Sequence, residues 1–215
     1  MDFVLFGIQG SGKGTQSKFL AEKYNLSVFE TGAALRVVAQ ENSDLSRKVK
    51  EIIETGHLVP TEIVMEIIEN FIEHAPKEQS LLFDGIPRSI EQAEAFDALM
   101  KKHNRDFAGI YFNLPKEEAM RRLTTRRICS KCKTVYPAAY AENTCSNCGN
   151  ELVTRTDDNA ASIENRLNAY NKETIPIIKK YAKQNLIIEV DAKPSIEKVT
   201  ENMLEKVEMF LIKSS

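Results

Sequence analysis

A glycine-rich loop near the N-terminus of the chain lies between a short apolar run and a polar segment with helical spacing. The three pieces are "FVLFG" from Phe3, "GIQGSGKGT" from Gly7 to Thr15, and "TQSKFLAEKY". Glycines let backbone N–H groups converge on phosphate oxygens, and the following helix adds its positive N-terminal dipole. The order strand, glycine loop, helix therefore predicts an α/β fold with a phosphate-binding loop, in which Lys13 supplies the formal charge.

The loop departs from the pattern G-x-x-x-x-G-K-[ST] at one position. Gly7, Gly12 and Lys13 match, but Gly14 stands where a Ser or Thr is expected, and the hydroxyl follows one residue later at Thr15. The alternative is a glycine-rich turn with a surface lysine, which would not need a strand before it and a helix after it. The loop strongly indicates a nucleotide and only weakly indicates which reaction.

Four further β-rich runs alternate with segments of helical spacing. They begin at Leu26, Leu81, Gly109 and Leu186. This alternation predicts a parallel sheet covered by helices on both faces. Two apolar stripes are expected to pack in the core, and they consist of Ile63, Ile67 and Phe71 and of Ile196, Val199, Met203, Val207 and Phe210.

Composition limits the partners that the chain can have. The 215 residues include 29 Lys and Arg and 31 Asp and Glu, a formal net charge of -2. Nucleic acids and anionic membranes attract proteins with a basic surplus, which this chain lacks. The N-terminus shows no secretory signal pattern, and no apolar run reaches the length of a membrane span. We expect a cytoplasmic, monomeric protein with no nucleic-acid or membrane partner.

Four cysteines lie in a region, from about 125 to 158, that lacks helical periodicity. They form "CSKC" and "CSNC", with the spacing C-x2-C-x12-C-x2-C. Two such knuckles can place four thiolates tetrahedrally around one zinc ion, which then has no open position and is structural. Iron on the same sulfurs is an alternative, and two disulfides are not expected in the cytosol. The predicted metal ligands are Cys129, Cys132, Cys145 and Cys148.

The displaced hydroxyl of the phosphate loop has a parallel in one family. The pattern G-x-x-G-x-G-K-G-T resembles the loop of the nucleoside monophosphate kinases, and of adenylate kinase above all. Segments similar to that family follow in order over nearly the whole chain: "TGAALR", "GHLVP", "FDGIPRSIEQA", "RRLTTRR" and "TRTDD". The cysteine region lies where some bacterial and archaeal members have a zinc-bearing lid, with a shorter spacing between the pairs here.

The resemblance implies a set of site residues. For ATP these are Gly10, Ser11, Gly12, Lys13, Gly14, Thr15, Arg122, Arg126, Val135, Tyr136 and Lys193. For AMP they are Thr31, Arg36, His57, Leu58, Val59, Gly85, Ile86, Pro87, Arg88, Gln92, Arg155 and Arg166, and the segment from Gly56 to Pro60 acts through its backbone. Those implied in the water shell of magnesium are Thr15 and Asp84. Those implied in catalysis are Lys13, Arg88, Arg126, Arg155 and Arg166.

The residues themselves give a second argument for part of this set. Asp84 ends a predicted strand, at the edge where open α/β sheets bind ligands, although capping of the strand end is the alternative. Arg122 and Arg126 are four apart on a predicted helix, which places both charges on one face, and a solvated face is the alternative. The chain departs from the family at Ala33, where an aspartate usually helps to hold magnesium, so we expect weaker magnesium dependence or slower turnover.

These observations together predict an organisation and a reaction. The expected core comprises residues 1–29, 60–124 and 159–215, with an AMP-binding insertion at 30–59 and a zinc-binding lid at 125–158. The predicted reaction is reversible phosphoryl transfer from MgATP to AMP, giving two ADP, with both insertions closing to exclude water. A UMP or CMP kinase is the first alternative, against which Gln92 and the cysteines weigh. A zinc-ribbon protein that binds nucleic acid is the second, and the net charge disfavours it.

Overall fold

A five-stranded parallel sheet forms the centre of the computed structural model, which describes residues 1–41, 43–55, 57–137, 140–155 and 158–214. The strand order is β2-β3-β1-β4-β8. The strands are β1 (Asp2–Gly7), β2 (Ser27–Glu30), β3 (Leu81–Asp84), β4 (Phe107–Asn113) and β8 (Ile187–Asp191). All five predicted runs are strands of this sheet, and their parallel pairing is confirmed. Every residue of β1 and β3 is buried, which explains their unbroken apolar runs.

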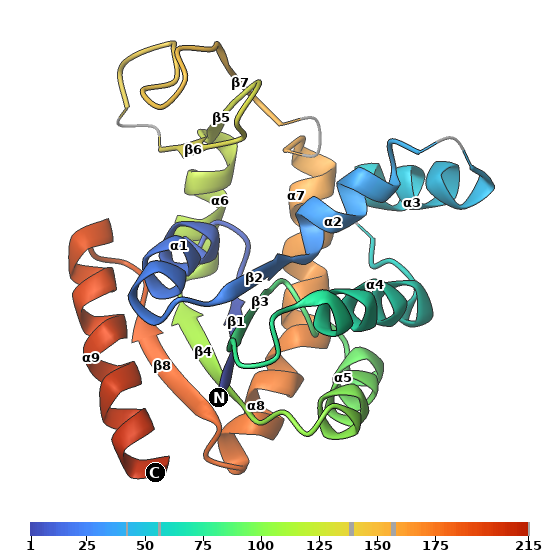
Figure 1. The fold of residues 1–215 in the computed structure, drawn as a ribbon. Helices are drawn as coiled ribbons and strands as arrows, with labels where there is room; N and C mark the ends of the chain where they lie inside the picture. Colours follow the sequence, from blue (N-terminus) through green and yellow to red (C-terminus); the bar gives the residue numbers. More distant parts are fainter. Residues whose placement is uncertain (42, 56, 138–139, 156–157, 215) are drawn as a thin grey trace.

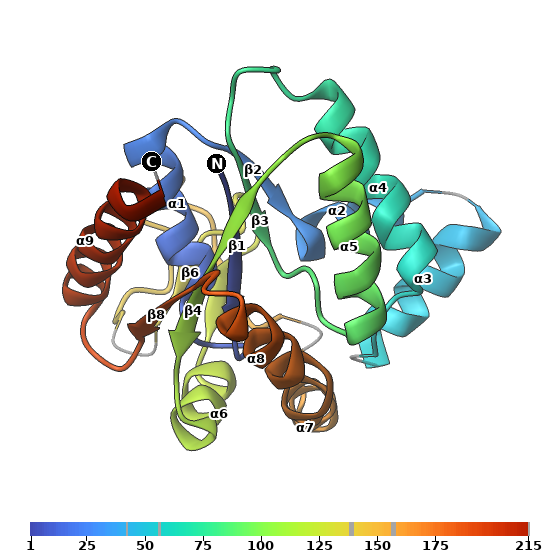
Figure 2. The same ribbon diagram turned by 90° about the horizontal axis from the view of Figure 1, so that it is seen from below.

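Helices cover both faces of the sheet. They are α1 (Lys13–Tyr24), α2 (Thr31–Val38), α3 (Asp44–Thr55), α4 (Thr61–His74), α5 (Ile90–Lys102), α6 (Lys116–Thr124), α7 (Ala160–Ala169), the π-helical turn η1 (Tyr170–Thr174), α8 (Ile175–Lys183) and α9 (Ile196–Ser214). Helices α1 and α9 pack on one side, and α4, α5 and α8 lie on the other (Figure 2). No helix within the described residues combines the length and apolarity that a membrane span needs.

Both predicted apolar stripes pack against the core, but the α4 stripe is not the most buried row of its helix. In α4 the buried row is Val64, Ile68 and Ile72, whereas the predicted row of Ile63, Ile67 and Phe71 is partly buried against the same core. Both rows recur every four residues, so periodicity could not decide which one is buried more deeply. In α9, Val199, Met203 and Val207 are buried as predicted and Phe210 is partly buried, but Ile196 is 44% exposed because it begins the helix at its open end.

Two segments stand away from the sheet. Helices α2 and α3 follow β2 and project to one side, where they fill the span predicted as the AMP-binding insertion (Figure 1). A small antiparallel sheet follows α6, with the order β6-β5-β7, and it consists of β5 (Arg127–Cys129), β6 (Val135–Tyr136) and β7 (Leu152–Val153). Its own core contains Cys129, Tyr136, Cys145 and Leu152. Leu35 of α2 and Val49 of α3 belong to the main core, whereas the small sheet has a separate core and needs its own source of stability.

Candidate active site

The phosphate loop bends sharply between β1 and α1. Gly10 and Gly12 have φ angles of +86° and +88°, a left-handed conformation that side chains with a Cβ adopt at a cost. Gly12 is also the N-cap of α1, and its carbonyl accepts hydrogen bonds from the N–H groups of Thr15 and Gln16 at 3.0 Å. The Ser11 hydroxyl is buried and has no hydrogen-bond partner among the described residues. A loop of this geometry presents donors toward an anion at the N-terminus of the helix.

Lys13 turns back onto the loop that it follows. Its Nζ donates to the carbonyls of Gly7 and Ile8, at 2.7 and 3.2 Å. Burial lowers the pKa of Lys13 from 10.5 to about 8, and the carboxylate of Asp84 opposes that shift. A partly buried ammonium whose hydrogen bonds within the described residues go to two carbonyl oxygens can exchange them for phosphate oxygens, which would stabilise its charge far better.

Asp84 lies at the carboxyl end of β3, beside Leu5 of β1. Its side chain is buried, and burial raises its pKa while the charge of Lys13 acts in the opposite direction. A Cβ built on Gly14 would lie 3.8 Å from Oδ2 of Asp84. A Cβ at this distance would make an ordinary van der Waals contact, so the spacing places residue 14 directly beside the carboxylate.

The loop after β3 holds Arg88 close to its own backbone. Gly85 has a φ of +87°, and a Cβ there would lie 2.7 Å from Nη2 of Arg88. The Nε of Arg88 donates to the Gly85 carbonyl at 2.7 Å, which fixes the guanidinium beneath the loop. Burial lowers the pKa of Arg88, as do the charges of Arg166, Arg36 and Arg155 around it, while Asp84 raises it. Four guanidinium groups from distant parts of the chain thus share one region, an arrangement that suits a polyanion.

A pocket of about 520 Å³ lies between the segment from His57 to Glu62 and the helices α5 and α7. His57, Leu58 and Val59 form one wall and Gln92 another. The Oε1 of Gln92 accepts from the N–H of Arg88 at 2.9 Å, and its Nε2 lies 3.5 Å from the Val59 carbonyl. The ring of His57 contacts the Thr55 hydroxyl at 3.0 Å, a partner that the sequence did not reveal. Gly56 lies outside the described residues.

Thr31 and Arg36 lie on α2, facing the loop after β3. The Thr31 hydroxyl is buried without a hydrogen-bond partner among the described residues, and a Cβ on Gly85 would contact its side chain at 3.6 Å. Arg36 forms an exposed ion pair with Glu30 at 3.3 Å. Ala33, where the resemblance led us to expect an aspartate, lines a separate groove with Val28 and Val37.

Asp158 lies between two of the predicted site arginines, Arg126 and Arg166, and it was not among the site residues predicted from the sequence. Asp158 accepts two hydrogen bonds from Arg126, at 2.8 and 2.7 Å, and one from Arg166 at 2.8 Å. Its side chain is fully buried, and burial lowers the pKa of Arg126. The only signal in the sequence was an acidic residue between Arg155 and Arg166 in the run "TRTDD". Asp158 therefore links Arg126, at the start of the cysteine segment, to Arg166 on helix α7.

The predicted pairing of Arg122 and Arg126 is wrong. Helix α6 ends at Thr124, so Arg126 lies beyond it, and the two side chains diverge. Arg122 donates to the Glu118 carboxylate at 2.8 Å and to the carbonyls of Ala192 and Lys193 at 3.1 and 3.3 Å, whereas Arg126 donates to Asp158. Arg122 therefore ties α6 to the loop between β8 and α9, the loop in which Lys193 was predicted to contact ATP.

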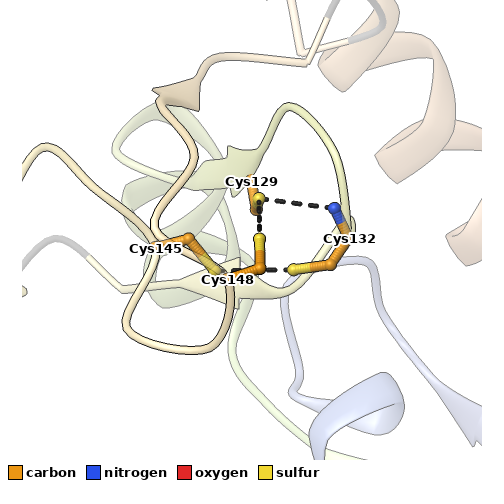
Figure 3. A group of neighbouring side chains, drawn as sticks. All are labelled: Cys129, Cys132, Cys145 and Cys148. Carbon is orange, nitrogen blue, oxygen red and sulfur yellow. Dashed lines mark hydrogen bonds between the residues drawn. The ribbon is translucent and has the colours of Figure 1, made fainter.

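The four cysteine sulfurs converge on one point (Figure 3). All four thiols are free, and their Sγ atoms lie within 4.8 Å of one another. The N–H groups of Lys131 and Cys132 lie 3.4 Å from the sulfur of Cys129, and Nδ2 of Asn150 lies 3.4 Å from that of Cys148. Such donors stabilise thiolates and orient them toward a metal. The donor set fits one tetrahedral ion that prefers sulfur.

Tyr136 belongs to this group and not to an open surface. Its side chain is buried, and its hydroxyl contacts the Cys145 sulfur at 3.1 Å and accepts from the N–H of Ser146 at 3.0 Å. Its neighbour Val135 is 49% exposed. A contact between Tyr136 and a nucleotide must therefore involve its backbone, whereas Val135 can present its side chain.

Comparison with known proteins agrees with this geometry. The family model for adenylate kinase matches residues 5–186. An adenylate kinase of Methanocella arvoryzae is 38% identical over 93% of this chain and 95% of its own length. One of Archaeoglobus fulgidus is 37% identical over 96% and 99%, and one of Acetivibrio thermocellus is 35% identical over 95% and 96%. The chain therefore belongs to the adenylate kinase family.

Proposed function

We propose that the chain transfers the terminal phosphoryl group of MgATP to AMP, reversibly, giving two molecules of ADP. The observation that supports this most directly is the group of cations at the carboxyl ends of β1 and β3, formed by the partly buried Lys13 and Arg88 with Arg126 and Arg166 nearby. A phosphoryl transfer needs no protein nucleophile, because the phosphate of the acceptor attacks directly. The protein contributes alignment and positive charge, both of which this group offers.

The donor site is assigned to the phosphate loop and to the loop after β8. Residues Gly10 to Thr15 surround the phosphates, and Lys13 leaves the carbonyls of Gly7 and Ile8 for phosphate oxygens. Arg122 and Lys193 flank the base, since Arg122 is already bound to the backbone of that loop. Val135 and the backbone of Tyr136 approach from the cysteine segment when it closes.

The acceptor site is assigned to α2, to the loop of Gly85 to Arg88, and to the pocket beside Gln92. Arg36, Arg88, Arg155 and Arg166 bind the phosphate. The charges of the other three arginines lower the pKa of Arg88, which supports their gathering around one anion. The unpartnered hydroxyl of Thr31 is available to the same anion. Gln92 and the backbone of His57 to Val59 recognise the base, and Ile86 and Pro87 shape the turn that carries Arg88.

Two metals accompany this assignment. The Asp84 carboxylate, beside the phosphate loop, and the Thr15 hydroxyl are the residues that would hold magnesium and its water shell, and magnesium would screen the charge of the ATP phosphates. The four cysteines would hold one zinc ion, which keeps the small sheet folded and takes no part in the chemistry. The spacing of the two cysteine pairs is typical of zinc sites, with iron on the same four sulfurs as the alternative. Elemental analysis of the purified protein distinguishes the two metals.

The proposal extends to organisation and surroundings. Residues 30–59 and 125–158 act as two flaps on the core of 1–29, 60–124 and 159–215, which the projecting positions of α2, α3 and the small sheet support. The formal net charge of -2 disfavours nucleic acid as a partner, and we assign the chain as a cytoplasmic monomer whose partners are ATP, ADP and AMP.

The deciding experiment compares AMP, GMP, CMP and UMP as acceptors, with MgATP as donor and ADP formation as the readout. AMP is expected to exceed the others in kcat/KM by more than tenfold, since a site built to bond one base rejects others strongly. Faster phosphorylation of UMP or CMP would make the chain a pyrimidine monophosphate kinase. Retention on oligonucleotides with no ADP formed from any acceptor would overturn the proposal entirely.

A further inference from the structure

Two side chains of α7 bond to the C-terminal end of α3, although more than a hundred residues separate them in sequence. The Ser162 hydroxyl donates to the Glu54 carbonyl at 2.7 Å, and Nδ2 of Asn165 donates to the Thr55 carbonyl at 3.2 Å. Both acceptors belong to the last turn of α3, where carbonyls have no partner within the helix. Helix α7 therefore supplies the cap that the end of α3 needs.

The direction of the Ser162 hydroxyl is fixed by its neighbours. Nδ2 of Asn159, the N-cap residue of α7, lies 3.2 Å from the hydroxyl oxygen, and Oδ1 of Asn159 accepts from the Ser162 N–H at 2.9 Å. The hydroxyl accepts from Asn159 and so directs its own hydrogen at Glu54. Ser162 is buried, whereas Asn165 is exposed and lines the pocket of about 520 Å³.

The chain that leaves α3 becomes a wall of that same pocket. The N–H of His57 donates to the Ile52 carbonyl at 3.1 Å, so the start of the wall is tied to α3. Two residues later, the carbonyl oxygen of Val59 lies 3.5 Å from Nε2 of Gln92. Because α3 is itself fixed to α7, the position of the wall from His57 to Val59 depends on Ser162 and Asn165.

We propose that Ser162 and Asn165 are positioning residues of the acceptor site, which set the distance between the wall from His57 to Val59 and helix α7. The proposal rests on the assignment of AMP to this site. Helix α7 also contains Arg166, whose Nε donates to the Ser162 carbonyl at 3.2 Å. One helix thus places both ends of the acceptor, with the base held by the wall and the phosphate by Arg166.

The test uses single variants of the full chain loaded with its metal. Ser162→Ala and Asn165→Ala each remove one hydrogen bond to α3, and Ser162→Thr keeps the hydroxyl. Glu164→Ala is the matched control, because Glu164 is exposed on the same helix and, in the described part of the chain, neither lines the pocket nor bonds to α3. The readouts are KM for AMP, KM for ATP, kcat, and the melting temperature of each variant.

Loss of one such bond is expected to raise KM for AMP by about threefold to tenfold in Ser162→Ala and Asn165→Ala, with KM for ATP unchanged. Ser162→Thr and Glu164→Ala should stay within about twofold of the parent chain, a margin small beside the effect of one hydrogen bond. The discrimination between AMP and GMP should fall in the two affected variants, because the wall that recognises the base is displaced.

Two outcomes overturn the inference. A lower melting temperature with unchanged KM for AMP would show that the bonds are only structural. An equal rise in KM for both nucleotides would show a general loss of the fold and not an effect on the acceptor site. Failure of the parent chain to phosphorylate or bind AMP is distinguishable from both, because it refutes the proposed function and takes this inference with it.

Discussion

Asp158 should contribute more to the stability of the ligand-free protein than any other acidic residue near the site. Replacement of Asp158 by asparagine preserves its shape and removes its charge. In the structure Oδ1 accepts from both Arg126 and Arg166, while Oδ2 accepts only from Nε of Arg126. An amide with its oxygen in the Oδ1 position keeps two hydrogen bonds and turns an N–H toward the third donor. The variant Asp158→Asn therefore loses one bond and the whole compensating charge.

The magnitude follows from the burial of the three groups. The side chain of Asp158 is 0% exposed, that of Arg126 is 15% and that of Arg166 is 10%. Removal of one partner from a buried ion pair costs about 3 to 5 kcal/mol, and retention of two hydrogen bonds favours the low end, about 3 kcal/mol. In a chain of this size each kcal/mol corresponds to roughly 2 to 4 °C, so the melting temperature should fall by about 6 to 12 °C.

Thermal unfolding of the metal-loaded protein, with and without saturating ATP and AMP, measures this effect. Asp97→Asn is the control, because Asp97 also accepts from a cation, Lys180 at 2.7 Å, but its side chain is 36% exposed. A pair so exposed contributes about 0 to 1 kcal/mol. Bound phosphates supply negative charge to the arginines. The difference in melting temperature between Asp158→Asn and the parent chain should therefore shrink by at least half when ATP and AMP are bound.

The reasoning would be refuted if Asp158→Asn melted no lower than Asp97→Asn. It would also be refuted if nucleotides stabilised Asp158→Asn less than they stabilise the parent chain, because without the Asp158 charge Arg126 and Arg166 should bind the phosphates more strongly.

Three other outcomes follow from the site. Because burial lowers the pKa of Lys13 to about 8, its contribution to the free energy of unfolding should rise between pH 8 and 10.5, and ATP binding at pH 8.5 should take up a proton that calorimetry in two buffers detects and that Lys13→Met abolishes. Replacement of both Cys145 and Cys148 by serine should remove about one metal ion per chain by elemental analysis and lower the melting temperature, while measurable kinase activity persists in the cold. Gly85→Ala, which combines a left-handed φ with a Cβ 2.7 Å from Arg88, should reduce kcat/KM for AMP by about tenfold or more while the apparent affinity for ATP, measured by titration, is unchanged.

Local pattern was enough to predict the strands and the phosphate loop. The five runs predicted from β-rich composition are the five strands of the sheet, because residues buried on both faces of a parallel sheet leave an unbroken apolar run. Helix α1 begins at Lys13 as the glycine loop predicted, since the left-handed Gly12 ends the loop there. The cysteine spacing was equally informative, because a tetrahedral site restricts the length of each knuckle.

Periodicity failed where two rows of apolar residues lie side by side. In α4 both the row with Ile63 and the row with Val64 repeat every four residues, and the packing of the helix buried the second row more deeply. The helical spacing of Arg122 and Arg126 was misleading for a different reason, since α6 ends before Arg126. The end of a helix depends on what the next segment can bond to, and that information is not in the spacing.

The sequence by itself determined the class of fold, the phosphate loop, the group of four cysteines and the resemblance that led to the family. Only the tertiary structure decided which charges neutralise one another and which helix ends meet. Asp158 and Arg126 are 32 residues apart, and Ser162 and Glu54 are 108 apart. Contacts over such separations form because the sheet brings their elements together, and a buried polar group then takes whichever partner the packing offers. Composition and spacing describe neighbours along the chain, so they are silent about these partners.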